Sequence, residues 1–256
     1  MCLIVIAQGL HPQWPLVAAA NRDEFHTRAT APSGPDPLRS GAFGGRDLVR
    51  GGSWMQVDAR GRFAAVTNVR SGSSQPERPR SRGDLVGDFM TGAMPAGPHL
   101  DELAHTAHEY GHFNLLLWDG ARLRFASNHP QWTRSVLEPG LHAMSNGALD
   151  ADWPKSRRVV DVLRRWIASG SGTLAPLFEA LVDTSVAPDG ELPDTGLAVE
   201  AERALSPPFV RNAVYGTRSS TVLLASTERA RWVEHRFDAD GRRVGSTDAR
   251  ITFASR

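Results

Sequence analysis

The single cysteine of this chain stands at position 2, directly after the initiator methionine. If Met1 is removed, a thiol and a free α-amine sit on the same residue, and an amine that titrates near ~8 can accept the proton of its own thiol. The thiolate is the nucleophilic form of cysteine, so Cys2 would bring its own base. The alternative is that Cys2 is a small apolar residue that begins a buried strand. One cysteine excludes an intramolecular disulfide and cysteine-based metal sites.

Polar residues follow three apolar runs that could end near this thiol. Residues 3–7 and 14–20 predict an N-terminal hairpin, which brings the polar stretch 21–24 (NRDE) back to the start of the chain. Asn68 and Asn146 each end a later apolar run. An asparagine at a strand end can donate N–H groups to a developing oxyanion, or it can cap a turn. The stretch 21–24 could likewise be an ordinary exposed turn.

The elements that would position these residues are short hairpins and amphipathic helices. Apolar runs around turn residues predict hairpins over 53–68, 113–126 and 218–238, a short strand pair around residues 138–140, and a last turn at Gly241. Helical spacing predicts helices over 83–92, 100–110, 174–182 and, most clearly, after Pro154, ending at Gly170. Residues 25–50, 71–82 and 184–203 are predicted to be loops. Hairpins pair antiparallel and segregated helices form outer layers, so we expect one α+β domain over 1–256.

Composition excludes several classes of function. The net charge of +1 gives no basic field for nucleic acid, and no apolar run approaches the ~20 residues of a membrane-spanning helix. The N-terminus lacks a basic leader, so we predict a cytoplasmic protein. His105, His108 and His112 could line one helical face and bind zinc or haem, or simply be solvated; we expect no metal or cofactor. The arginines of residues 78–82 are predicted to lie in a solvated loop, with recognition of an anionic substrate as the alternative.

Nine short motifs together resemble the NRDE family, whose animal member is transport and Golgi organisation protein 2. The resemblance extends over essentially the whole chain, and its motifs are Met1-Cys2, 21–25 (NRDEF), 44–47 (GGRD), 51–54 (GGSW), 61–70 (GRFAAVTNVR), 81–86 (SRGDLV), 144–146 (MSN), 153–155 (WPK) and 215–222 (YGTRSSTV). That family is distantly similar to N-terminal nucleophile hydrolases of the choloylglycine hydrolase type. The resemblance implies a four-layer αββα sandwich of two antiparallel sheets and cleavage of amides by an N-terminal cysteine.

The resemblance also implies roles for particular residues. Cys2 resembles the nucleophile, Asn68 the oxyanion-hole asparagine, Asn146 a second active-site asparagine and Arg218 a late arginine. The early motif departs from the hydrolase pattern, in which Arg precedes Asn. We therefore assign Arg22 and Asp23 to orienting the amine and the substrate, and Asn21, Glu24 and Trp54 to substrate binding, with Asn21 and Glu24 able to exchange roles with the first pair.

Two functions from different classes follow. The first is a hydrolase that cleaves a linear amide C–N bond of a small molecule, with Cys2 as nucleophile. The second is a non-catalytic carrier that uses the same pocket, for haem or lipid, with a role in trafficking. Both have a small molecule as partner, and neither fixes the oligomeric state. The hydrolase requires removal of Met1, because a retained methionine blocks the α-amine of Cys2.

Overall fold

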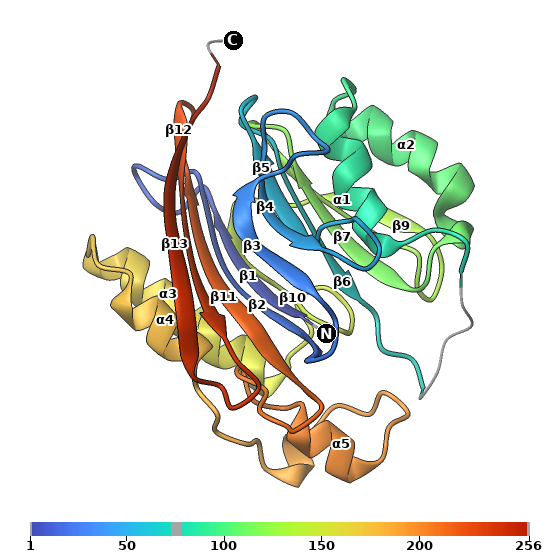
Figure 1. The fold of residues 1–256 in the computed structure, drawn as a ribbon, viewed down its shortest axis with the longest axis vertical. Helices are drawn as coiled ribbons and strands as arrows, with labels where there is room; N and C mark the ends of the chain where they lie inside the picture. The colour runs from blue at the N-terminus through green and yellow to red at the C-terminus, as the bar shows by residue number, and fades with distance from the viewer. Residues whose placement is uncertain (1, 73–77, 255–256) are drawn as a thin grey trace.

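Two antiparallel sheets pack face to face in the computed structural model, which describes residues 2–72 and 78–254 (Figure 1). The first sheet, sheet A, has the strand order β10-β1-β2-β11-β12-β13. Its strands are β1 (Cys2–Gln8), β2 (Leu16–Phe25), β10 (Gly140–Met144), β11 (Tyr215–Ala225), β12 (Arg229–Phe237) and β13 (Arg243–Thr252). The state of Met1 and the middle of the predicted loop 71–82 lie outside the described residues.

The second sheet, sheet B, runs in simple sequence order from β3 to β9. Its strands are β3 (Thr30–Pro35), β4 (Ala42–Asp47), β5 (Met55–Asp58), β6 (Phe63–Asn68), β7 (Phe113–Trp118), β8 (Leu123–Ser127) and β9 (Thr133–Val136). Every neighbouring pair in both sheets is antiparallel, as the hairpins predicted.

Helices cover the outer face of each sheet, which completes a four-layer αββα sandwich (Figure 1). The helices are α1 (Arg82–Thr91), α2 (Ala96–Thr106), α3 (Pro154–Ser169), α4 (Ala175–Leu181) and α5 (Val199–Ala204), with short 3-10 turns at Ala107–Glu109 and Asp189–Glu191. α1 and α2 lie on sheet B, and α3 and α4 lie on sheet A. No helix of the described chain is long and apolar enough to span a membrane.

Strand β1 is apolar from Cys2 to Ala7 because both of its faces are buried. Ile4 and Ile6 pack into the layer between the two sheets, whereas Leu3 and Val5 pack against the helices on the far side. Successive side chains of a strand point to opposite faces, so a strand in the second layer of a sandwich has no polar face. This alternation continues through Cys2 and decides which way its side chain points.

Helix α3 forms where the apolar spacing after Pro154 predicted a helix. Val159, Leu163 and Trp166 form its buried stripe against sheet A, and Pro154 stands in its first turn. Gly170 ends the helix with φ 62°, in the left-handed region that glycine adopts without strain.

Several predicted elements are wrong in detail. Residues 25–50 hold strands β3 and β4, which the glycines and prolines concealed because they give no apolar period. The predicted pair around residues 138–140 does not exist: β9 pairs with β8 in sheet B, and β10 pairs with β1 in sheet A. Residues 184–203 include α5. The histidine face is also absent, since α2 ends at Thr106 and the His112 ring packs on that of His129, with ring centroids 4.3 Å apart.

Candidate active site

Cys2 begins β1 directly opposite Arg22 of β2, as the predicted hairpin requires. Its side chain shares the face of Ile4 and therefore points between the sheets, with 8% of the residue exposed. Burial raises the pKa of the thiol, and the neighbouring Asp23 charge raises it further, against the lowering effect of Arg22. The thiol is therefore held in its protonated form unless a base takes the proton.

Strand alternation divides the four residues of the NRDE stretch between two faces of sheet A. Arg22 lies over the Trp54 ring of sheet B, 4.8 Å from its centroid, and its Nη2 stands 3.6 Å from a carboxylate oxygen of Glu24. Asn21 instead points to the helix side, where its amide donates to the carbonyls of Leu181 and Pro208 at 2.7 and 2.8 Å.

Asp23 shares the helix-side face with Asn21. Its Oδ1 accepts a 2.7 Å hydrogen bond from the hydroxyl of Thr217, its partner across β11. Burial raises the pKa of the Asp23 carboxyl, and the charges of Lys155 and Arg22 oppose that rise. The Asp23 carboxylate is thus buried on the helix side of β2, and Arg22 and Glu24 project from the opposite face of the same strand.

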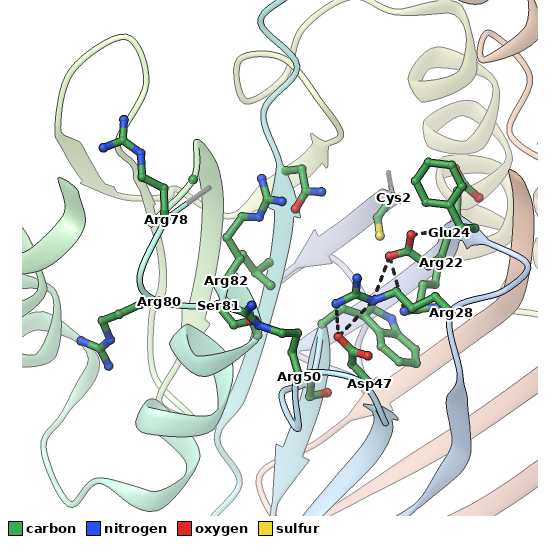
Figure 2. Close-up of a pocket in the computed structure, with 18 residues that line it drawn as sticks. Cys2, Arg22, Glu24, Arg28, Asp47, Arg50, Arg78, Arg80, Ser81 and Arg82 are labelled. Atoms are coloured by element: carbon green, nitrogen blue, oxygen red, sulfur yellow. Dashed lines mark hydrogen bonds and ion pairs between the residues drawn. The ribbon is translucent and has the colours of Figure 1, made fainter. Parts of the chain in front are cut away.

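A cavity of about 430 Å³ opens beside the Cys2 thiol (Figure 2). Of the predicted site residues, it is lined by Cys2, Arg22, Asp23, Glu24, Trp54 and Asn68. It is also lined by arginines to which no catalytic or substrate-binding role was assigned: Arg28, Arg50, Arg78, Arg80 and Arg82. Arg78, Arg80 and Arg82 therefore border the candidate site, which favours the second of the two interpretations of that segment.

The positive charge in this cavity is only partly balanced by carboxylates. Arg28 reaches Asp47 at 2.5 Å and Glu24 at 3.7 Å, and Figure 2 shows this chain of contacts across the cavity wall. Nη1 of Arg22 is buried without a hydrogen-bond partner among the described residues. Arg82 donates to the carbonyl of His112 at 3.2 Å, and burial lowers the pKa of its guanidinium. The buried Arg22 and the partly exposed Arg82 thus both line the cavity. The Arg22–Glu24 contact at 3.6 Å is the carboxylate contact that the described residues give this pair.

The two predicted oxyanion asparagines have different environments. Asn68 ends β6 and lines the cavity, and no described residue is hydrogen-bonded to its side chain. Asn146 is fully buried and does not line the cavity; its Nδ2 donates to the main-chain carbonyl of Asn68 at 2.8 Å. The Ser145 hydroxyl donates to the Cys2 carbonyl at 3.0 Å. The segment 145–146 therefore ties the end of β6 to the start of β1.

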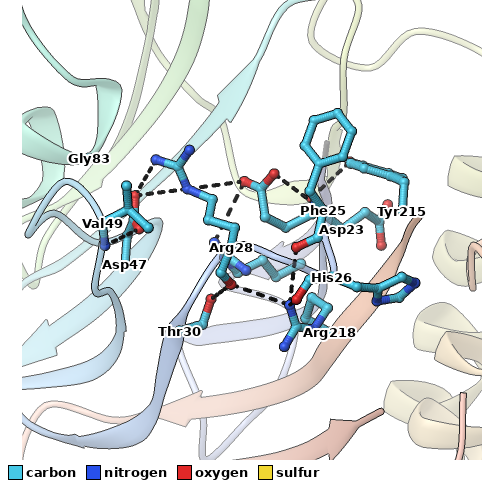
Figure 3. A network of polar contacts seen from close by, with 12 residues as sticks. Asp23, Phe25, His26, Arg28, Thr30, Asp47, Val49, Gly83, Tyr215 and Arg218 are labelled. Atoms are coloured by element: carbon cyan, nitrogen blue, oxygen red, sulfur yellow. Dashed lines mark hydrogen bonds and ion pairs between the residues drawn. The ribbon is translucent and has the colours of Figure 1, made fainter. Parts of the chain in front are cut away.

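Arg218 is likewise not among the residues that line the cavity. It sits in a bulge of β11 between Thr217 and Ser219, and its Nη1 donates to the carbonyls of Phe25, His26 and Arg28 at 3.1–3.3 Å (Figure 3). These contacts hold the turn after β2, from which Arg28 reaches the cavity. Asn21, Asn146 and Arg218 thus surround the site rather than line it.

Besides the arginines of the cavity, Lys155 lies near the site and was given no role by the sequence, although it belongs to the quoted WPK motif. It lies in the first turn of α3, is 2% exposed, and interacts electrostatically with Asp23 and Cys2. A usable signal was present, because Lys155 is the only lysine of the chain among 29 basic residues.

A second cavity, of about 420 Å³, shares Glu24, Phe25 and Asn68 with the first. Its remaining lining is mostly apolar: Ala201, Ala204, Leu205, Val210, Asn212 and Tyr215. A charged compartment and an apolar compartment therefore adjoin at the end of β2 and β6, next to the candidate nucleophile.

Solved structures with the same architecture are N-terminal nucleophile hydrolases. A Caenorhabditis elegans N-acylethanolamine-hydrolyzing acid amidase ortholog has a TM-score of 0.53 at 12% identity, over 87% of this chain and 92% of that one. A mutant of the conjugated bile acid hydrolase from Clostridium perfringens has a TM-score of 0.56 at 7% identity, over 100% and 97%. At these identities the likeness shows the fold, and the predicted αββα sandwich is confirmed.

Sequence comparison identifies the family. The mouse Transport and Golgi organization 2 homolog is 27% identical over 244 residues, which is 88% of each chain. The human Transport and Golgi organization protein 2 homolog is 26% identical over 254 residues, covering 89% of this chain and 90% of the relative. The sequence profile of Transport and Golgi organisation 2 matches residues 1–239. The chain therefore belongs to the Transport and Golgi organisation 2 family, which the NRDE motifs had indicated.

Proposed function

We propose that the protein is an amidohydrolase that cleaves a small-molecule amide with Cys2 as nucleophile. The observation that carries the proposal is the placement of the chain's only thiol at a strand end beside a charged cavity, next to Arg22 and an Asn68 side chain with no partner among the described residues. The N-terminal nucleophile hydrolase fold supports it as an analogy.

The chemistry would proceed in two steps. The Cys2 thiolate bonds to the amide carbonyl carbon, and Asn68 donates an N–H to the oxyanion that forms. The C–N bond then breaks as the nitrogen takes up the proton that the thiol gave to its base, which leaves a thioester on Cys2. Water hydrolyses the thioester, releases the acid and restores the thiol. Asn146 would not contact the oxyanion itself. It would hold the main chain of Asn68 in place through its hydrogen bond to the Asn68 carbonyl.

The α-amine of Cys2 is our choice of base, which requires removal of Met1. Burial raises the pKa of the thiol, so a base is needed to form the thiolate near neutral pH. The two adjoining cavities favour an amide that joins an apolar group to an anionic one. The apolar part fits the lining of Ala201, Ala204 and Leu205, and the anion fits Arg22 and Arg82.

The test combines mass and turnover. Intact mass of protein purified from its own host should show loss of Met1, and mass spectrometry should show a single alkylation by iodoacetamide at Cys2. A panel of N-acyl amino acids and matched neutral N-acyl amides, followed by free-acid release, should show hydrolysis that Cys2→Ala abolishes and a preference for the anionic members. Retained Met1 together with an unreactive thiol contradicts the proposal.

The alternative is a carrier for an apolar small molecule such as a lipid or haem, and the apolar cavity is the observation that favours it. A carrier would bind such a ligand equally well after Cys2→Ala, and it would release no acid from any amide. If the thiolate binds haem iron, Cys2→Ala should instead change the absorption spectrum of the bound haem. Ligand retention measured by gel filtration on wild type and Cys2→Ala separates these outcomes.

A further inference from the structure

Four strands form the edges of the two sheets: β10 and β13 in sheet A, and β3 and β9 in sheet B. An edge strand offers unpaired main-chain N–H and C=O groups to other strands, and proteins often limit this with short edges or proline. β10 has five residues, β9 has four, and β3 (TAPSGP) contains two prolines. β13 has ten residues and no proline, so it is the exception among these edges (Figure 1).

The side chains of β13 alternate between a contact face and an open face. Ile251 packs against the core between the sheets, and the Thr247 hydroxyl lies 3.5 Å from a main-chain carbonyl of β3. Asp248 and Arg250 project from the opposite face, where both are exposed. The open face of β13 therefore carries one negative and one positive charge, two residues apart.

Arg250 has an unfavourable neighbour within its own chain. The residue opposite it on β12 is Arg231, and like charges directly opposite each other destabilise a sheet. Arg231 is compensated, because its Nε and Nη2 donate to the Asp248 carboxylate at 3.1 and 2.7 Å. Among the described residues, no carboxylate forms an ion pair with Arg250. A carboxylate on the open side of β13 would therefore relieve a repulsion that the single chain leaves in place.

A second copy of β13 supplies this carboxylate in one register. In a symmetric antiparallel pair, the two-fold axis passes between the two copies of one residue, and residues equally far from it lie opposite each other. An axis at Ala249 places Asp248 of each copy opposite Arg250 of the other, and residues 246–252 pair. An axis at position 248 or 250 would instead bring two aspartates or two arginines together.

We propose that the protein forms a homodimer through β13, in which two copies of sheet A join into one continuous antiparallel sheet about Ala249. The partner is a second copy because the charges of Asp248 and Arg250 complement themselves in this register. β13 lines neither cavity at the candidate site, so the pairing leaves both cavities open. The dimer does not depend on the proposed function.

The first test measures association in solution. Sedimentation velocity of the wild type should show a reversible dimer with a Kd of roughly 1–100 µM, because one strand pair is a small interface. Asp248→Arg and Arg250→Asp each convert both opposite-charge contacts into like-charge contacts, and each should raise Kd by ~10-fold or more. A wild type that is still monomeric at ~500 µM overturns the proposal.

Matched controls come from the turn between β12 and β13. Asp240 and Arg242 are exposed there and form an ion pair of 2.8 Å. Asp240→Arg and Arg242→Asp make the same charge reversals and break an ion pair within the chain, but they lie outside the paired residues 246–252. Both should therefore leave Kd unchanged. A Kd that these controls raise as much as Asp248→Arg does would show a general charge effect and overturn the pairing.

A mixture of the two reversed variants gives the sharpest result. Asp248→Arg carries two positive charges at positions 248 and 250, and Arg250→Asp carries two negative charges, so a heterodimer restores both opposite-charge contacts. The mixture should associate with a Kd within ~3-fold of the wild type, although each variant alone does not. The Asp248→Arg chain still lacks its ion pair with Arg231, so the recovery cannot come from that contact.

Circular dichroism checks that each variant is folded. If one is not, Asp248→Asn and Arg250→Gln remove a single charge each and should still raise Kd by ~2–5-fold. A dimer that neither reversal weakens, or a mixture that associates no more tightly than its components, contradicts the pairing.

Cross-linking tests the register. In a Cys2→Ala background, Ser246→Cys and Thr252→Cys place thiols at exposed positions that lie opposite each other between copies. A bismaleimide that spans ~8 Å should join the mixed variants, because opposite residues have Cβ atoms ~5 Å apart. Ser246→Cys alone should not be joined, because its two thiols lie ~20 Å apart along the strands. Equal cross-linking of Ser246→Cys alone overturns the axis at Ala249.

Discussion

At the scale of single residues, the candidate site separates groups that face the cavity from groups that hold them. Asn68 lines the cavity, whereas Asn146 donates a hydrogen bond from its Nδ2 to the main-chain carbonyl of Asn68. Arg22 faces the cavity, whereas Arg218 supports the turn that carries Arg28. The two asparagines therefore differ in role, and so do the two arginines: one of each lines the cavity and the other supports the main chain around it.

This separation predicts opposite effects for the two asparagines. Asn68→Ala should lower kcat by ~10²–10³-fold if the side chain stabilises the oxyanion, with a change in unfolding free energy below about 1 kcal/mol. Asn146→Ala removes a fully buried side chain and the donor to the part-buried Asn68 carbonyl, and should cost about 1–3 kcal/mol of stability. Urea denaturation and turnover, measured on both variants, test the pair; a stable Asn146→Ala protein beside an unstable Asn68→Ala protein would reverse our assignment.

At the scale of elements, the turn between β10 and α3 is held by a histidine–carboxylate pair. His142 Nδ1 lies 2.9 Å from Asp150 Oδ2, and its Nε2 lies 3.0 Å from the Glu138 carbonyl. The other oxygen of Asp150 accepts from the Ala143 N–H at 2.7 Å. The hydrogen bond to Asp150 raises the pKa of His142, against the lowering effect of burial.

The raised pKa of His142 determines how its contribution to folding stability changes with pH. A group whose pKa is higher in the folded state adds stability that is complete below its unfolded value, ~6.5, and is lost as pH rises through the folded pKa. His142→Gln should therefore be less stable than wild type at pH 5.5, by less than about 1 kcal/mol for this partly exposed pair, with a smaller difference at pH 8.5. Urea denaturation at both pH values checks this. Asp150→Asn should reduce the same pH dependence; a difference that grows with pH contradicts it.

Helix α1 approaches the loop before β5 so closely that only glycine fits at the contact. A Cβ added to Gly83 would lie 2.9 Å from the Gly52 Cα and 3.0 Å from the Ser53 nitrogen. Both neighbours are main-chain atoms, which cannot move aside without shifting an element. Gly83 also lines the cavity, so this contact sets the position of Arg82 as well.

We predict that Gly83→Ala destabilises the protein by about 1–3 kcal/mol because the helix must move. Gly97→Ala is the matched control within a helix, since its Cβ would meet the Arg124 side chain at an ordinary 3.4 Å. There the alanine should be neutral or stabilising by up to about 1 kcal/mol. Thermal and urea unfolding of both variants measure the contrast, and equal stabilities would show that α1 adjusts freely.

At the scale of the whole molecule, the two sheets are joined by polar as well as apolar contacts. Glu234 of β12 is 1% exposed, and its carboxylate accepts from the Ser33 N–H at 3.0 Å and the Ser33 hydroxyl at 2.5 Å on β3. Beside it, Phe43 and Trp232 pack edge to face across the same interface, with ring centroids 5.9 Å apart.

Loss of this carboxylate should weaken the sandwich as a unit. Glu234→Ala strands the Ser33 donors in a buried interface and should cost about 2–3 kcal/mol, whereas Ser33→Ala removes one hydroxyl donor and should cost about 1 kcal/mol. Because both sheets share one core, fluorescence and circular dichroism should report the same urea midpoint in each variant. Glu228→Ala, at an exposed position of the β11–β12 turn, should change little. Separate transitions for the two probes would mean that the sheets unfold independently.

The sequence by itself determined most of the hairpins and which polar stretch lies beside Cys2. Turn residues between apolar runs located the hairpins of β1–β2, β5–β6, β7–β8 and β11–β12, and the period of α3 located its buried stripe. The first hairpin placed Cys2 beside Arg22, because strand pairing follows from turn position. Strands β3 and β4 were not predicted, because their glycines and prolines leave no apolar alternation to identify a strand.

Only the tertiary structure decided which polar residues face the cavity. Alternation separates Asn21 from Arg22, but which face of β2 meets the second sheet and which meets the helices depends on how the layers stack. Arg82 enters the site from α1 and Lys155 approaches from α3, each from an element far from Cys2 in the sequence. No local pattern carries that information, because it arises when two sheets and their covering helices exclude water from a shared interface.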